Sequence, residues 1–150
     1  MFKTIVVGTD GSHTASEAVT RAARLAATAD AKLHVVTAYP KASSAAWGYA
    51  VATPAVTVDF GELEAQAREH ATSVLQQVKQ RLTDEATEVE LHARAGDAAD
   101  VILDVAEEQG ADLIVVGNRG MTGARRFLLG SVPNKVAHHA LCDVLIASTT

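Results

Sequence analysis

Short apolar runs recur along the chain, and each is separated from the next by a longer segment with helical spacing. The runs are nearly continuous in β-branched and aliphatic residues, which is typical of strands buried on both faces. They cover residues 4–7, 33–37, 89–93, 113–116 and 144–147. The pattern therefore predicts five strands, and the long connections between them favour parallel pairing.

The connecting segments place apolar residues three and four positions apart, which predicts amphipathic helices. Ser12 is the expected N-cap of the first helix, and the last helix begins near Ser131. The third helix opens on Asp97 as N-cap and closes at Gly110, a residue that tolerates the left-handed conformation. The apolar face of the longer second helix runs through Leu63, Ala67, Ala71, Val74, Leu75, Val78 and Leu82.

Alternation of strands and helices predicts an α/β fold with right-handed crossovers. We expect an open, doubly wound, five-stranded parallel sheet of order 3-2-1-4-5, with helices on both faces in a three-layer, Rossmann-like sandwich. At 150 residues the chain is expected to form one domain over residues 1–150. Sheets of this kind bind ligands where the strand order reverses, here between the first and fourth strands.

Both strands at that reversal lead into glycine-containing loops. The first loop, residues 8–12, reads Gly-Thr-Asp-Gly-Ser. The second follows the spacing G-x2-G-x9-G-S from Gly117 through Gly120 to Gly130 and Ser131. Glycines let backbone N–H groups approach an anion, and a helix N-terminus adds free donors and a favourable dipole. The pattern predicts a phosphate site, with a nucleotide as the ligand.

Asp10 is expected at the mouth of this crevice, where a carboxylate can accept hydrogen bonds from both hydroxyls of a ribose. An alternative remains open, in which Asp10 and Ser12 only cap the first helix.

Charge and composition exclude several classes of protein. The net charge of -5 argues against a nucleic-acid surface, which needs clustered Lys and Arg. Cys142 is the single cysteine, so an intrachain disulfide and a multi-cysteine metal site are excluded. The first residues lead directly into a core strand, and no apolar run approaches the length of a membrane span. We therefore expect a cytoplasmic protein that does not contact membranes.

Residues 6–12, residues 111–117 and the complete G-x2-G-x9-G-S element resemble the universal stress protein family, and specifically its nucleotide-binding branch. The resemblance extends over nearly the whole chain and implies the fold shared with adenine nucleotide alpha hydrolases. Members that carry the motif bind ATP, usually with Mg²⁺ or a similar ion beside the phosphates. Some members prefer cyclic AMP, and the spacing leaves that ligand open here.

The resemblance also implies roles for individual residues. Asp10 would hold the ribose hydroxyls, with Gly8 and Thr9 beside it, while the backbone of Ala38 meets the adenine edge and Val116 packs on its face.

For the phosphates, Gly117 and Gly120 would let the loop pass close to the ribose and first phosphate. Donors to the rest of the phosphate chain would come from Gly130, Ser131, Val132 and Asn134. Arg119, Arg125 and Arg126 either fold over a triphosphate or are solvated, and we favour solvation for the last two.

The histidines predict no metal site. Four of them fall in separate elements, and the adjacent pair His138 and His139 would point in different directions on a helix. The four are His13, His34, His70 and His92. The long loop at residues 40–60 places Trp47 and Tyr49 either over the ligand or a partner, or packed down as anchors.

Rapid catalysis is not expected, because the Walker motif and its lysine are absent and no general base stands out except Asp10. We predict nucleotide binding with at most slow hydrolysis, in a stress-response switch or sensor. A receiver or flavin domain is disfavoured, because the third strand leaves through Arg94-Ala95-Gly96 with no phosphorylatable Asp. A scaffold without nucleotide is the remaining alternative. Residues 142–148 supply an apolar edge strand, which predicts a homodimer.

Overall fold

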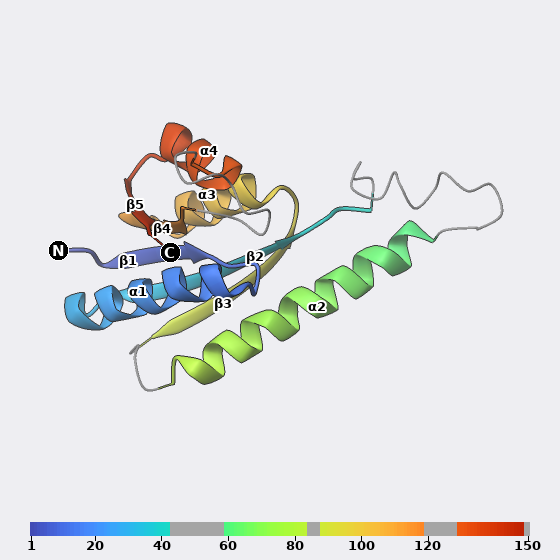
Figure 1. The fold of residues 1–150 in the computed structure, drawn as a ribbon, viewed down its shortest axis with the longest axis horizontal. Helices are drawn as coiled ribbons and strands as arrows, with labels where there is room; N and C mark the ends of the chain where they lie inside the picture. Colours follow the sequence, from blue (N-terminus) through green and yellow to red (C-terminus); the bar gives the residue numbers. More distant parts are fainter. Residues whose placement is uncertain (43–58, 84–87, 119–128, 149–150) are drawn as a thin grey trace.

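The computed structural model describes residues 1–42, 59–83, 88–118 and 129–148. Five strands form one parallel sheet in the order β3-β2-β1-β4-β5 (Figure 1). They are β1 (Thr4–Gly8), β2 (Lys32–Tyr39), β3 (Val89–Ala95), β4 (Leu113–Gly117) and β5 (Asp143–Ala147). The fold class and the strand order predicted from the sequence are confirmed.

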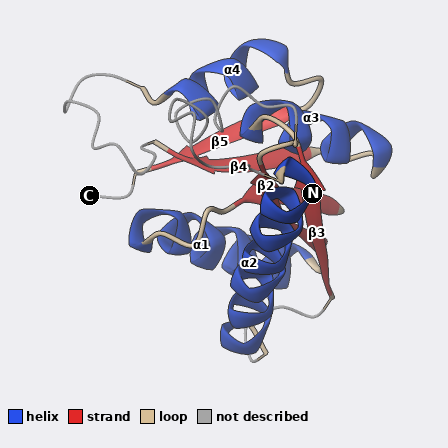
Figure 2. Cartoon of the chain, turned by 90° about the vertical axis from the view of Figure 1, so that its right-hand side faces the viewer, coloured by secondary structure: helices blue, strands red, loops and turns tan. Residues whose placement is uncertain are grey.

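Four helices cover the two faces of the sheet. They are α1 (His13–Ala29), α2 (Phe60–Arg81), α3 (Ala98–Glu108) and α4 (Ser131–His139). Helices α1 and α2 lie on one face, and α3 and α4 lie on the other (Figure 2). This is the three-layer arrangement that strand and helix alternation favours.

Two buried clusters hold the layers together. Alternate strand residues such as Ile5, Leu33 and Val115 pack against α1 and α2, because successive side chains of a strand point to opposite faces. Their neighbours Val6 and Ile114 pack against α3 and α4. Both faces of the central strands are therefore buried, which explains why the strands read as continuous apolar runs.

The helix caps follow the predicted residues. The Ser12 hydroxyl accepts a hydrogen bond from the Ala15 N–H at 3.2 Å, and the Asp97 carboxylate accepts one from the Asp100 N–H at 3.3 Å. Gly110 follows α3 with φ of 62°, in the left-handed region that favours glycine. These contacts confirm the starts of α1 and α3 and the end of α3.

Strand β2 extends further than its apolar run indicates. Ala38 and Tyr39 continue the ladder with β3, where they pair with Arg94 and Ala95, whereas the register with β1 ends at Gly8 and Val36. The end of β2 therefore projects past the end of β1, toward the edge where the predicted site lies.

Strand β5 lies at one edge of the sheet, paired only with β4. The side chains of Leu145 and Ile146 are each 37% exposed, and Leu141 just before the strand is 90% exposed. In the part of the chain that the structure describes, no helix has both the length and the apolar character to cross a bilayer.

Candidate functional site

A pocket of about 160 Å³ opens at the carboxyl ends of β1 and β4, at the reversal of the strand order. This is the position that the general rule for doubly wound sheets predicts. The described residues that line it come from both loops, β2, α1, α3 and the start of α4. They are Gly8, Thr9, Asp10, Ala15, Val36, Ala38, Ala98, Ile102, Val116, Gly117, Gly130, Ser131, Val132 and Pro133.

The first loop is fixed by hydrogen bonds to β2. The Thr9 N–H donates to the Val36 carbonyl at 2.9 Å, and the buried Thr37 hydroxyl donates to the Thr9 carbonyl at 2.9 Å. Gly11 then turns the chain with φ of 82°, a left-handed value. The loop therefore holds Asp10 in one position at the rim of the pocket.

The sequence suggested two roles for Asp10, binding of a ribose and capping of the first helix, and its two carboxylate oxygens allow both. Its Oδ1 accepts a hydrogen bond from the Ser12 N–H at 2.8 Å, which closes a short turn before α1. Its Oδ2 has no hydrogen-bond partner among the described residues. The carboxylate is exposed and lines the pocket, so one oxygen stabilises the loop while the other is available to a ligand.

Gly8 lies close to the side chain of Ile102 in α3. A Cβ placed on Gly8 would overlap Cδ1 of Ile102 in α3. A larger residue at position 8, which also lines the pocket, would therefore have to displace the Ile102 side chain.

The start of α4 presents unpaired donors to the pocket. The Gly130 N–H donates to the Asn118 carbonyl at 3.2 Å, and the Asn134 N–H donates to the Gly130 carbonyl at 3.0 Å. Pro133 has no N–H. This leaves the N–H groups of Ser131 and Val132 without a hydrogen bond among the described residues. Two such groups, together with the helix dipole, would attract an anion.

Gly130 itself has space around it. A Cβ there would meet Pro133 Cδ at 3.4 Å and the Asn118 carbonyl oxygen at 3.5 Å, which are ordinary contacts. Its φ of -59° is open to any residue. Neither the described packing nor the backbone demands a glycine at this position, which lines the pocket.

The opposite side of the pocket is apolar. Val36, Ala38, Ile102 and Val116 form this wall, which suits a flat, weakly polar ring. In a parallel strand, alternate residues direct both backbone groups to the same neighbour. The Val36 carbonyl points toward β1, where it accepts the Thr9 N–H. Ala38, two residues later, therefore also directs its N–H and C=O toward the β1 side, at a level where β1 has already ended.

The structure brings most of the predicted residues together. Gly8, Thr9, Asp10, Ala38, Val116, Gly117, Gly130, Ser131 and Val132 all line the pocket. Asn134 does not line it, and its N–H is bonded to the Gly130 carbonyl. Arg119, Gly120, Arg125, Arg126, Trp47 and Tyr49 lie outside the described residues.

Sequence reasoning missed the contribution of the helices. Ile102 and Ala98 of α3 and Ala15 of α1 reach the pocket, as does Pro133 of α4. Their apolar spacing marked them only as core residues. The signal that distinguishes them is position, since they occupy the helix turns nearest the carboxyl edge of the sheet.

The histidines differ from expectation in one respect. His34 and His92 are in separate strands, as predicted, but β2 and β3 are neighbours and the two rings come into contact. His34 Nδ1 and His92 Nε2 lie 2.8 Å apart. The two histidines thus lie in separate elements, as expected, but the pairing of β2 with β3 brings their rings together.

The chain is a doubly wound α/β protein with a pocket at the strand-order reversal, lined by main-chain donors and apolar side chains. The chain belongs to the universal stress protein family, since the model of that family matches residues 1–148. The predicted family is confirmed.

Individual relatives match over almost their full length. The chain is 38% identical to the universal stress protein Rv1636 of Mycobacterium tuberculosis, over 99% of this chain and 98% of that protein. It is 32% identical to the universal stress protein YxiE of Bacillus subtilis, over 97% and 99%. The crystal structure of a universal stress protein in complex with cAMP is 35% identical, with a TM-score of 0.73 over 99% and 98% of the two chains.

Proposed function

We propose that this protein binds an adenine nucleotide, with ATP as the ligand, in the pocket between the ends of β1 and β4. The observation that carries the proposal is that, among the described residues, the N–H groups of Ser131 and Val132 at the start of α4 have no hydrogen-bond partner. An anion is the group that such a terminus attracts. The apolar wall opposite provides the place for a base.

The main chain of β2 would form the hydrogen bonds to the base. The N–H and C=O of Ala38 point past the end of β1 into the pocket mouth. An adenine edge carries one ring acceptor beside an amino donor, which matches one N–H beside one C=O. Val36 and Val116 would cover the ring faces.

The sugar and the phosphates would bind at opposite ends of the rim. Oδ2 of Asp10 would accept hydrogen bonds from the ribose hydroxyls, and Ser131 and Val132 would donate to phosphate oxygens. Asp10 is the single carboxylate among the described residues of the pocket wall. The site therefore fits Mg²⁺ only as an ion that accompanies the phosphates, which supply most of its oxygen ligands.

Cyclic AMP is the second candidate, because a relative 35% identical to this chain was crystallised with cAMP. The two ligands differ at the ribose. In cyclic AMP the 3′ oxygen belongs to the phosphate ring, so only the 2′ hydroxyl is left to donate to Asp10. Loss of the Asp10 charge is therefore expected to weaken ATP more than cyclic AMP.

Calorimetric titration with ATP, ADP and cyclic AMP tests the proposal. The variant Asp10→Asn should weaken ATP binding by about 10- to 100-fold, the equivalent of about 1.5–3 kcal/mol for a charge-assisted hydrogen bond. Asp30→Asn is the matched control, since Asp30 is exposed at the far end of α1 in a left-handed conformation that Asn also adopts. Wild-type protein that binds none of the three ligands at millimolar concentration excludes the proposal.

We further propose binding without rapid turnover. The described residues of the pocket include no lysine, arginine or histidine, and Asp10 is committed to the loop and the sugar. Phosphoryl transfer normally needs a cation over the phosphates and a group that orients the nucleophile. An ATP turnover of about 1 per second or faster would contradict this view.

A homodimer through β5 completes the proposal. The outer edge of β5 carries partly exposed Leu145 and Ile146, beside the fully exposed side chain of Leu141. Exposed apolar edge strands tend to pair with a second chain. A stress-response switch would follow if the nucleotide binds one of two conformations more tightly than the other.

A further inference from the structure

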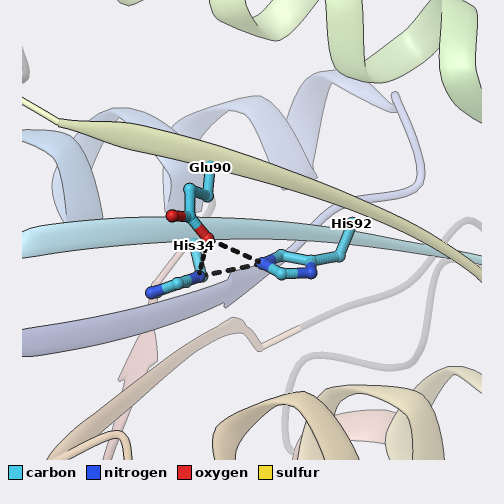
Figure 3. A group of neighbouring side chains, drawn as sticks. All are labelled: His34, Glu90 and His92. Atoms are coloured by element: carbon cyan, nitrogen blue, oxygen red, sulfur yellow. Dashed lines mark hydrogen bonds and ion pairs between the residues drawn. The ribbon is translucent and has the colours of Figure 1, made fainter. Parts of the chain in front are cut away.

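Three potential metal ligands, none of which lines the pocket, converge on the face of the sheet that carries α3. His34 lies in β2, and Glu90 and His92 lie next to it in β3. In the register of the two strands, His34 pairs with Glu90. Figure 3 shows the three side chains directed toward one another.

The distances between their polar atoms are short. His34 Nδ1 lies 2.8 Å from His92 Nε2 and 3.5 Å from Glu90 Oε2. His92 Nε2 lies 4.0 Å from the same carboxylate oxygen. One nitrogen from each ring and one oxygen from the carboxylate thus surround a common point.

Burial disfavours protonation of the two rings. His34 is 1% exposed and His92 is mostly buried. Burial is the largest cause that lowers the pKa of His34, and it likewise lowers the pKa of His92. Neutral imidazoles offer a lone pair, whereas protonated ones do not.

We propose that His34, Glu90 and His92 form a binding site for a divalent transition-metal ion of the Zn²⁺ type. Two imidazoles and a carboxylate suit Zn²⁺ and its neighbours in the first transition series, rather than Mg²⁺ or Ca²⁺, which prefer all-oxygen sites. The ligands are His34 Nδ1, His92 Nε2 and Glu90 Oε2.

The spacing needs only a small adjustment. Ligand atoms of a tetrahedral zinc site lie about 3.4 Å apart, given bonds of about 2.0–2.2 Å. The contact of His34 with Glu90 already matches this spacing. The two rings would open by about half an ångström, and Glu90 would approach His92 by a similar amount. Glu90 makes this movement feasible because its side chain is 44% exposed.

The surrounding charges favour a cation. Lys32 Nζ holds the other oxygen of Glu90, Oε1, at 2.6 Å and also contacts Glu88 at 3.0 Å. The Arg94 guanidinium pairs with both carboxylate oxygens of Glu108, at 2.7 and 2.6 Å. Three carboxylates therefore face two cations, which leaves one negative charge around two neutral rings. Lys32 also orients the carboxylate, as outer partners of metal ligands do.

Titration with Zn²⁺ alone tests this site in the full chain. We expect one ion per chain in the wild-type protein. The variants Glu90→Gln and His92→Gln should each lose at least about tenfold in affinity, the scale seen when metal sites are perturbed. Co²⁺ alone provides a second readout, since His92→Gln should abolish the visible absorption bands that a low-symmetry, nitrogen-ligated cobalt site gives.

The control is His138→Gln, because His138 is exposed on α4 and its Nδ1 contacts the Asn134 carbonyl at 2.7 Å. This variant should bind Zn²⁺ like the wild type. Glu90→Gln changes an exposed side chain by one atom, so its fold is expected to survive, and unchanged nucleotide binding would verify that. The proposal is overturned if wild-type protein takes up no Zn²⁺ at millimolar concentration. It is also overturned if Glu90→Gln and His92→Gln bind as tightly as the wild type.

Discussion

Thr9 donates its backbone N–H to the carbonyl of Val36 at 2.9 Å, and this is the last main-chain hydrogen bond between β1 and β2. Beyond this hydrogen bond β1 has ended, and β2 continues to Tyr39 with no strand beside it where β1 would have been. The pocket occupies the space that further residues of β1 would have filled.

Replacing Gly8 by alanine should destabilise the protein. The new Cβ would overlap Ile102 Cδ1, and overpacking of this kind costs about 1–3 kcal/mol. Chemical denaturation of Gly8→Ala measures the loss. Ile102→Val in the same chain removes Cδ1 and should restore part of the stability, whereas a double variant as unstable as the sum of the two single ones would contradict the contact.

Replacing Gly130 by serine should weaken ATP binding without lowering the stability of the fold. α4 has no side-chain N-cap, and serine is a preferred one, so the free energy of unfolding should stay equal or rise by about 1 kcal/mol. The same hydroxyl would accept the Val132 N–H that the proposed phosphate needs. We expect weaker ATP binding at unchanged or higher thermal stability, and tight binding by Gly130→Ser would argue against a phosphate at this terminus.

Replacing Thr37 by valine should loosen the first loop. The Thr37 side chain is 4% exposed, and its hydroxyl donates to the Thr9 carbonyl. Loss of the donor leaves a buried acceptor unpaired, at a cost of about 1–3 kcal/mol. Thr37→Ser keeps the hydroxyl and should lose less stability in the same denaturation experiment. Equal losses in the two variants would mean that the methyl group, and not the hydrogen bond, stabilises the loop.

Cys142 should react slowly with alkylating reagents. Burial raises the pKa of its thiol, and the nearby carboxylates of Asp143 and Asp112 raise it further. A raised pKa means a smaller thiolate fraction near neutral pH, and the thiolate is the reactive form. The rate of iodoacetamide modification against pH should therefore show a midpoint above that of the same protein in denaturant. A midpoint below it would indicate an activated cysteine.

The edge of β5 can be blocked without breaking its pairing to β4. The Asn118 N–H donates to the Ala147 carbonyl, so Ala147 and Leu145 direct their backbone groups to β4 while Ile146 directs its own outward. Ile146→Pro removes only an outward donor. We expect a monomer in light scattering, with Ile146→Ala still dimeric. A dimer that persists in Ile146→Pro would place the interface elsewhere.

Local signals in the sequence predicted which segments form strands and helices, and where several of the helices begin or end. Ser12, Asp97 and Gly110 each define a helix terminus through hydrogen bonds or backbone angles within a few residues of the chain. The glycine motif after β4 predicted the pocket, because its final Gly-Ser pair marks the start of α4, which lines the pocket.

Features that depend on how residues far apart in the chain align with one another could not be predicted from the sequence. Ala38 belongs to β2 because β3 is long enough to pair with it, which no property of its neighbours reveals. The contact between His34 and His92 joins residues 58 positions apart and requires both the order of the strands and their alignment. Ile102 reaches Gly8 only because α3 packs across the end of β1.

The overhang of β2 has an evolutionary consequence. Ala38 offers its peptide group to the pocket, and any amino acid except proline offers the same donor and acceptor. Substitutions at this position can thus accumulate as long as the side chain stays small enough for the cavity. If the proposed nucleotide is recognised through this peptide group, its recognition depends on the length of β2 and not on the side chain at position 38, so a comparison of side chains between relatives would not detect it.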